Sequence, residues 1–124
     1  MVGNSPASSF TPNRLYDYDS PPDKVYMAIV EEGLFFDKCG AIRFNSNKWT
    51  YLSRLQEKLA GEVAPEVVDI EQEELVEKGI LTRSRDMQMF RVGKGKYIWT
   101  VGIKIDPEMS SACLKMYKLC HDRN

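Results

Sequence analysis

Seven basic side chains lie within one segment of the chain, around two strand-like runs that Gly93 and Gly95 separate. Only Asp86 opposes them between Lys78 and Lys104, so the segment has a net charge of +6. Guanidinium and ammonium groups at this density could contact phosphates, and glycines at the turn would let the backbone approach a ligand closely. The basic residues are Lys78, Arg83, Arg85, Arg91, Lys94, Lys96 and Lys104.

The preceding segment carries the opposite charge. Between Glu57 and Glu77, eight carboxylates are opposed only by Lys58, which gives a net charge of −7. The chain as a whole has a charge of −1, so its total charge does not indicate a nucleic acid or a membrane as partner. What is unusual is the separation of negative and positive charges into two neighbouring segments. A partner protein with a basic surface would be steered to the acidic segment. The expected protein-binding residues are Glu66, Glu71, Glu73, Glu74 and Glu77.

Two aromatic residues lie among the cations of the hairpin. Exposed Tyr97 and Trp99 could stack on bases, which suits single-stranded or shape-based binding. The spacing of two residues between Trp99, Val101 and Ile103 predicts instead that all three face the core. Lys and Arg also protect edge strands from aggregation without binding anything. In the alternative function, the hairpin contacts DNA or RNA phosphates through Arg83, Arg85, Arg91, Lys94 and Lys96.

No motif in the sequence indicates catalysis or a bound metal. The turn at 93–96 lacks the GxxxxGK[ST] spacing of a phosphate-binding loop. Cys39, Cys113 and Cys120 are an odd number without tight spacing, which is typical of a reducing compartment. The only histidine, His121, lies next to Cys120, and no Cys or His pair elsewhere in the sequence could complete a zinc site. No pattern indicates that His121 serves as the base of a catalytic cysteine. We therefore expect no catalytic residue, no metal, no cofactor and no enzymatic activity.

The length and composition fit one domain with an appended arm. The 124 residues are 43% hydrophobic, which suffices for a single core. Residues 1–20 are rich in Ser, Pro, Asn and Asp and predict a flexible arm, and residues 21–121 predict one domain. We find no secretion signal and no apolar run of about 20 residues. The expected location is the cytoplasm or nucleus, without membrane contact.

Three helices are expected before the hairpin. The first begins after Ser20, where prolines occupy the first turn, and ends at Gly33. Leu34–Phe36 are then expected to turn inward as a hydrophobic plug. Residues 45–61 have the apolar stripe of a second helix, and residues 64–79 predict a third that closes at a glycine.

The remaining patterns predict strands and a closing helix. After Gly79 the apolar period changes from helical to twofold. Asp106 and Pro107 are typical of a helix start, and the apolar face of this last helix could cover the sheet or form a dimer seam. The expected state is a monomer or a weak homodimer. The expected strands lie in 39–45, 80–84, 87–92 and 96–105.

This order of elements, together with the "EELVEKGIL" junction at 73–81, resembles the winged helix-turn-helix superfamily over about residues 22–105. The resemblance implies an α+β, winged-helix-like fold with a three-helix core, a short strand and a C-terminal β-hairpin wing, here followed by a closing helix. A small α+β domain with a three-stranded antiparallel sheet is the alternative.

In this superfamily the third helix usually enters the major groove. Here it would bring carboxylates towards phosphates, and it lacks the set of Arg, Lys, Asn and Gln that reads base edges. We therefore expect a non-catalytic interaction module of a larger intracellular protein, with a regulatory role, which docks a basic protein partner through its acidic helix. DNA or RNA binding through the basic wing is the alternative.

Overall fold

The computed structural model describes residues 19–109 and Lys115. Its elements form an α+β fold with three α-helices and two antiparallel hairpins, as the sequence predicts at this level. In chain order these are α1 (Pro21–Gly33), β1 (Leu34–Phe36), β2 (Ile42–Phe44), α2 (Leu52–Lys58), α3 (Pro65–Glu77), β3 (Leu81–Gly93), β4 (Lys96–Ile105) and the 3₁₀ turn η2 (Pro107–Met109).

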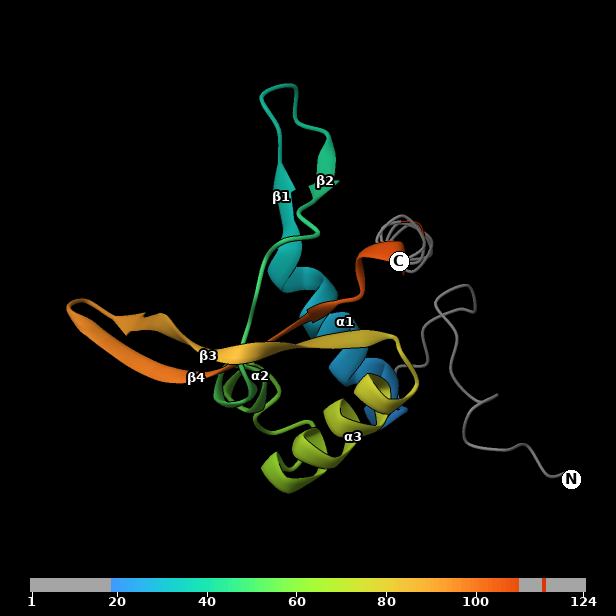
Figure 1. Cartoon of the computed structure of the whole chain (residues 1–124). Helices are drawn as coiled ribbons and strands as arrows, with labels where there is room; N and C mark the ends of the chain where they lie inside the picture. The colour runs from blue at the N-terminus through green and yellow to red at the C-terminus, as the bar shows by residue number, and fades with distance from the viewer. Residues whose placement is uncertain (1–18, 110–114, 116–124) are drawn as a thin grey trace, which may run out of the picture.

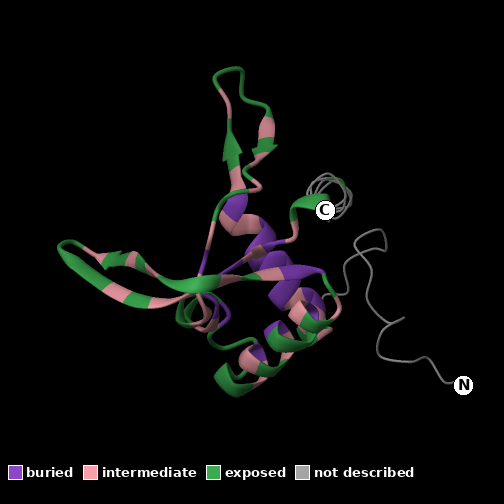
Figure 2. Ribbon diagram, in the orientation of Figure 1, coloured by how far each residue is buried: buried purple, intermediate pink, exposed green. Residues whose placement is uncertain are grey.

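The two hairpins leave the helical part in different directions (Figure 1). Helix α1 lies at the centre, and α2 and α3 pack against it. The β3–β4 ribbon crosses this helical part with one half and extends beyond it with the other. The β1–β2 hairpin projects from the end of α1. Figure 2 shows that buried residues concentrate in α1 and in the parts of the ribbon and helices next to it.

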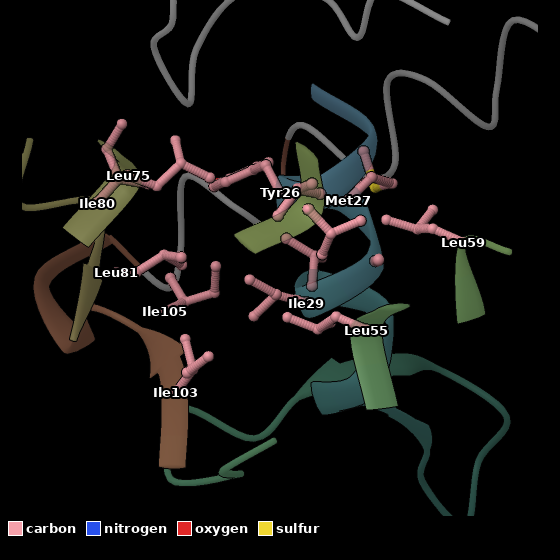
Figure 3. Close-up of a cluster of buried hydrophobic side chains, with 14 of the residues drawn as sticks. Tyr26, Met27, Ile29, Leu55, Leu59, Leu75, Ile80, Leu81, Ile103 and Ile105 are labelled. Carbon is pink, nitrogen blue, oxygen red and sulfur yellow. The ribbon is translucent and has the colours of Figure 1, made fainter. Parts of the chain in front are cut away.

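The core forms where α1 meets the other helices and the ribbon (Figure 3). Tyr26 is fully buried in α1, and Leu55 of α2 and Leu75 of α3 are buried beside it. Burying a side chain of this size contributes roughly 1.5–3 kcal/mol. The ribbon adds three buried side chains from its near half: Leu81, Ile103 and Ile105.

Helix α1 begins where the sequence predicts, but its glycine, Gly33, does not end the helix in a left-handed conformation. Ser20 is the N-cap residue, and prolines occupy the first turn. Gly33 is the last helical residue and does not have a positive φ. A Cβ built there would lie 2.7 Å from Cε1 of Phe44, so glycine allows β2 to pack closely against the helix end.

The prediction that Leu34–Phe36 turn inward holds for Leu34, which packs against the core, and is wrong for Phe35 and Phe36. The three residues form β1, which pairs with β2, and Phe36 is 73% exposed. The turn explains the difference, because Asp37 Oδ1 accepts hydrogen bonds from the backbone N–H groups of Cys39 and Ala41 at 2.9 Å. Its Oδ2 accepts one from Arg43 Nε at 2.8 Å. The Arg43 bond, helped by the backbone bonds, lowers the pKa of the Asp37 carboxyl.

The second helix is shorter than the sequence predicts. Of residues 45–61, only Leu52–Lys58 are α-helical. Thr50 instead pairs antiparallel with Ile103, each backbone N–H donating to the other carbonyl at 2.8 Å. A partner distant in sequence therefore prevails over the helical apolar stripe that includes Trp49.

The third helix and the ribbon agree more closely with the sequence. Helix α3 spans Pro65–Glu77, and Gly79 has a φ of +79°, the left-handed conformation that suits a residue after a helix end. β3 is one strand where two were expected, with a register shift between Arg83 and Met87. The sheets are two-stranded, so the three-stranded alternative is not observed in residues 19–109.

Two predicted segments fall mainly outside the described residues. Of the arm predicted for residues 1–20, only 19 and 20 are described. The closing helix was expected from Asp106, where the chain enters the 3₁₀ turn η2, and beyond Met109 only Lys115 is described. Cys113, Cys120 and His121 also lie outside the described part.

Candidate nucleic-acid interface

The β3–β4 ribbon has two halves, which the register shift in β3 separates. In the base half, Leu81–Arg83 pair with Ile103–Ile105 beside the helices. In the tip half, Met87–Gly93 pair with Lys96–Val101 and extend away from the helices (Figure 1). The tip half is the part of the molecule in which basic and aromatic side chains are both abundant.

One side of the tip half carries apolar side chains that solvent can reach. Met89 lies opposite Trp99, and Arg91 lies opposite Tyr97. Because side chains alternate along a strand, these pairs share one side of the ribbon. We call this side the outer face; its members are Met87, Met89, Arg91, Tyr97, Trp99 and Val101.

The prediction that Trp99, Val101 and Ile103 all face the core is wrong for Trp99. The three share one side of β4, as their spacing indicates, and Ile103 is buried. Val101 is only half-buried, and Trp99 is 62% exposed. The ribbon is longer than the helical part beneath it, so the same side of β4 leaves the core on the way to the tip (Figure 2).

The opposite side of the ribbon, the inner face, is partly covered. The ring of Phe90 lies 4.7 Å from that of Tyr51, measured between centroids. A Cβ on Gly102 would lie 2.9 Å from Cε3 of Trp49, so glycine lets this indole lie directly on the strand. Lys104 Nζ lies 4.5 Å from the centroid of the same ring, a cation–π contact. These contacts orient the ribbon so that its outer face remains open.

The register shift adds a polar anchor at the middle of the ribbon. Ser84 Oγ accepts a hydrogen bond from Gly102 N at 2.7 Å and donates one to Asp86 O at 2.8 Å. Such a bulge bends the strand and increases its twist. It therefore separates the half that is packed on the helices from the half that projects.

Most of the predicted cations lie on the projecting half. Between described residues, no ion pair involves Arg85, Arg91, Lys94 or Lys96, and all four are exposed. Arg91 Nε donates to Gly93 O at 3.3 Å, within the turn that Gly95 closes with a φ of +69°. Arg91 belongs to the outer face, Lys94 and Lys96 lie at the turn next to it, and Arg85 lies in the irregular segment between the two halves.

Arg83 has a different environment from the other predicted cations. It lies in the base half, where its Nη2 donates to Gln72 Oε1 of α3 at 3.3 Å. The Gln72 amide in turn donates to Asp69 Oδ1 at 3.1 Å. We assign Arg83 to the attachment of the ribbon to α3, so of the five predicted nucleic-acid-binding residues three, Arg91, Lys94 and Lys96, lie in the tip half or its turn.

A cleft of about 610 Å³ lies beside the ribbon base. Its charged lining is mixed, because Asp86 and Asp106 accompany the basic residues, and Asp106 Oδ1 accepts a hydrogen bond from Thr82 Oγ1 at 3.1 Å. This mixture does not select an anion as clearly as the tip half does. The basic residues in the lining are Arg83, Arg85 and Lys104.

The acidic residues predicted to bind a protein lie along α3. Four of them are exposed, and between described residues no ion pair involves an α3 carboxylate. The fifth, Glu71, is half-buried, and this burial raises its pKa, an effect to which the charge of Glu74 adds. Ile70 is 54% exposed on the same helix. The four exposed acids are Glu66, Glu73, Glu74 and Glu77.

The described residues contain no other feature that assigns a chemistry. Residues 19–109 and Lys115 include no group of three His, Cys, Asp or Glu side chains that could hold a metal ion. None of the helices in that part of the chain is long and apolar enough to cross a membrane. Comparisons with protein-family models, curated proteins and solved structures found no match to the chain.

Met87 and Met89 are the members of this surface that sequence reasoning missed. Their spacing of two residues matched a strand, but it did not reveal which side of the ribbon would be covered. A count from the turn would not have found them, because with Gly93 and Lys96 paired an unbroken register places Met89 opposite Thr100, and only the register shift between Arg91 and Gly93 places it opposite Trp99. A register shift of one residue moves side chains to the other face, so neither the shared side nor its exposure followed from the sequence.

Proposed function

We propose that this chain is a non-catalytic, winged-helix-like nucleic-acid-binding module that contacts its ligand through the tip half of the β3–β4 ribbon. The observation that carries the proposal is the exposure of Trp99 on a ribbon in which, between Lys78 and Lys104, Asp86 is the only acidic residue. An indole open to solvent costs hydrophobic free energy, so a surface that keeps one beside several cations is suited to a ligand with flat rings and negative charge.

The order of elements supports the winged-helix-like part of the proposal. Three helices precede the long hairpin, and Thr50, between α1 and α2, pairs with Ile103 at the ribbon base. The order of helices followed by a long hairpin is the basis of the resemblance to the winged helix-turn-helix superfamily. The β1–β2 hairpin is an addition to that plan.

The acidic helix α3 argues that the ribbon, and not a recognition helix, makes the contact. Exposed carboxylates such as Glu73 and Glu77, about 6 Å from a phosphate, would each be repelled by several tenths of a kcal/mol in water, and by more at lower dielectric. Entry of α3 into a major groove is therefore unfavourable, whereas the exposed cations on the ribbon face no such repulsion.

A salt titration of oligonucleotide binding tests this function. We expect binding that weakens steeply with salt, because cations displace counterions from the phosphates. The triple variant Arg91→Ala, Lys94→Ala, Lys96→Ala should bind more weakly and reduce the slope of log K against log salt by about 3, roughly one for each cation. Fluorescence anisotropy with labelled oligonucleotides measures both quantities.

Lys38 provides a matched control for the single variant Lys94→Ala. Both lysines are exposed in hairpin turns, and each substitution removes one positive charge. Lys38→Ala should leave the affinity and the salt slope nearly unchanged, whereas Lys94→Ala should lower both. Equal effects would mean that only the net charge matters, and absence of binding at low salt would remove the proposed function.

A second candidate function is the docking of a basic protein partner through α3. The observation that favours it is Ile70, an exposed apolar side chain on a helix with four exposed glutamates. Interfaces commonly surround an apolar anchor with charged residues. A helical peptide rich in Lys and Leu is a suitable probe. Ile70→Ser and the triple reversal of Glu73, Glu74 and Glu77 to Lys should each weaken its binding, and unchanged binding in both would remove this candidate.

A further inference from the structure

We infer that the outer face binds single-stranded nucleic acid, with bases stacked on Tyr97 and Trp99 and phosphates held by the neighbouring cations. This inference rests on the proposed function and specifies its ligand. It is carried by the arrangement of the rings and charges on the two strands.

The separation of the two rings favours a single strand. Tyr97 and Trp99 are two residues apart on one strand, so their Cα atoms are about 6.7 Å apart at the usual rise. Bases of a duplex lie about 3.4 Å apart along each strand and cover one another's faces. An extended single strand can separate successive bases enough for each to reach its own side-chain ring.

The cations are placed beside the rings that would hold the bases. Arg91 is the cross-strand partner of Tyr97, and Lys96 precedes Tyr97 in the chain. Directly opposite side chains in a sheet have Cβ atoms about 5 Å apart. A base stacked on Tyr97 would therefore have its phosphates within reach of Arg91, whereas Lys96, one position earlier, points to the other side of the strand.

The surroundings of Trp99 indicate tolerance of base identity. Its cross-strand partner is Met89, and Met87 lies opposite Val101 beside it. Thioether side chains are flexible and make favourable contacts with rings, but they provide no strong hydrogen-bond donor or acceptor. Stacking against such a surface favours any exposed base, so we expect weak sequence preference.

A second copy of the chain is a poorer occupant of this face. Symmetric packing of two outer faces would gather Arg91, Lys94 and Lys96 of both copies in one interface. Between described residues, no ion pair neutralises them. A polyanion relieves this repulsion, whereas a like-charged copy increases it.

The test compares a single strand with a duplex for the unchanged protein and three variants by fluorescence anisotropy. The probes are labelled oligothymidylate of about 12 nucleotides, within the range of known single-strand sites, and a duplex of equal length. Trp99→Ala should weaken binding to the single strand about 10- to 100-fold, because stacking on one base accounts for that much. Its salt slope should stay near that of the unchanged protein, since no phosphate contact is lost.

Phe36→Ala is the matched control. Phe36 is 73% exposed on the other hairpin, so this variant also removes an exposed aromatic ring, but away from the outer face. It should bind both probes as the unchanged protein does. Trp99→Phe should restore most of the affinity that Trp99→Ala loses, because phenylalanine retains a ring that can stack.

The possible outcomes separate this inference from the function on which it rests. Tighter binding of the duplex, with Trp99→Ala as active as the unchanged protein, would overturn stacking and leave phosphate contact by the ribbon intact. Absence of binding to both probes at low salt would remove both. Dimers that form at low salt and disappear in Trp99→Ala, detected by analytical ultracentrifugation, would assign the outer face to a second copy instead.

Discussion

At its base, the β3–β4 ribbon buries Leu81, Ile103 and Ile105 beside α1 and α3, whereas at its tip the same side of β4 presents Trp99 and Tyr97 to solvent. In both halves successive side chains point to alternate sides, and both halves belong to the same pair of strands. The difference arises from what lies underneath, because the helices end before the ribbon does (Figure 1). A single pattern therefore provides a folding surface in one half and a candidate binding surface in the other.

The largest expected effect separates these two roles. Ile103→Ala removes a buried side chain and should reduce the free energy of unfolding by about 3 kcal/mol, within the range for large-to-small core substitutions. Trp99→Ala should change it by only about 0.5 kcal/mol, as is usual for exposed positions. Urea unfolding followed by circular dichroism measures both. A loss near 3 kcal/mol in Trp99→Ala would show that the tip half contributes to the core.

A smaller effect is expected where the two halves join. Gly102→Ala would place a Cβ 2.9 Å from the indole of Trp49, so this substitution should cost about 2 kcal/mol of stability through overpacking. Gly93→Ala is the control in the same ribbon, because its Cβ would meet only Lys96, at 3.6 Å, and Gly93 does not have a positive φ. Thermal unfolding of the two variants should differ clearly. Equal melting temperatures would mean that Trp49 moves without cost.

The smallest effect concerns α3, which supports the base half. Burial raises the pKa of Glu71 in the folded protein, so its carboxylate opposes folding at neutral pH. The protonated carboxyl of Glu71 stabilises the folded protein fully at a pH below the ordinary pKa of 4.5. This stabilisation is lost as the pH rises through the raised pKa of the folded protein. Glu71→Gln should therefore raise the free energy of unfolding slightly at pH 7, and the gain should disappear towards pH 4. A gain that persists at low pH would indicate another cause.

Local signals in the sequence predicted the parts of the fold that depend on neighbours in the chain. The start of α1 after Ser20 and the glycine after α3 follow from the conformational limits of proline and glycine. The turn of the ribbon was evident from the glycines at 93 and 95. The cations at 91–96 could be assigned to the tip of the hairpin, because they lie within or next to this turn in the sequence.

The features that sequence reasoning missed depend on contacts between distant segments. Trp49 and Thr50 fit a helical stripe, but the backbone of Thr50 pairs with β4 instead. Phe36 fits a hydrophobic plug, but the turn at Asp37 pairs its strand with β2. The exposure of Trp99 depends on where the helices end beneath it. Periodicity shows which side chains share a side, but not what covers that side.

The pairing of Thr50 with Ile103 has a consequence for the order of folding. The two residues are roughly 50 positions apart, and α2, α3 and β3 all lie between them. Closing so long a loop costs conformational entropy, which the contact offsets only once it has formed. We therefore expect the contact between Thr50 and Ile103 to form late, after the local helices and the hairpin turn. If so, truncating Ile103 should accelerate unfolding and leave the refolding rate almost unchanged in stopped-flow experiments. The pairing of Thr50 with Ile103 would then be the last step in forming the native state.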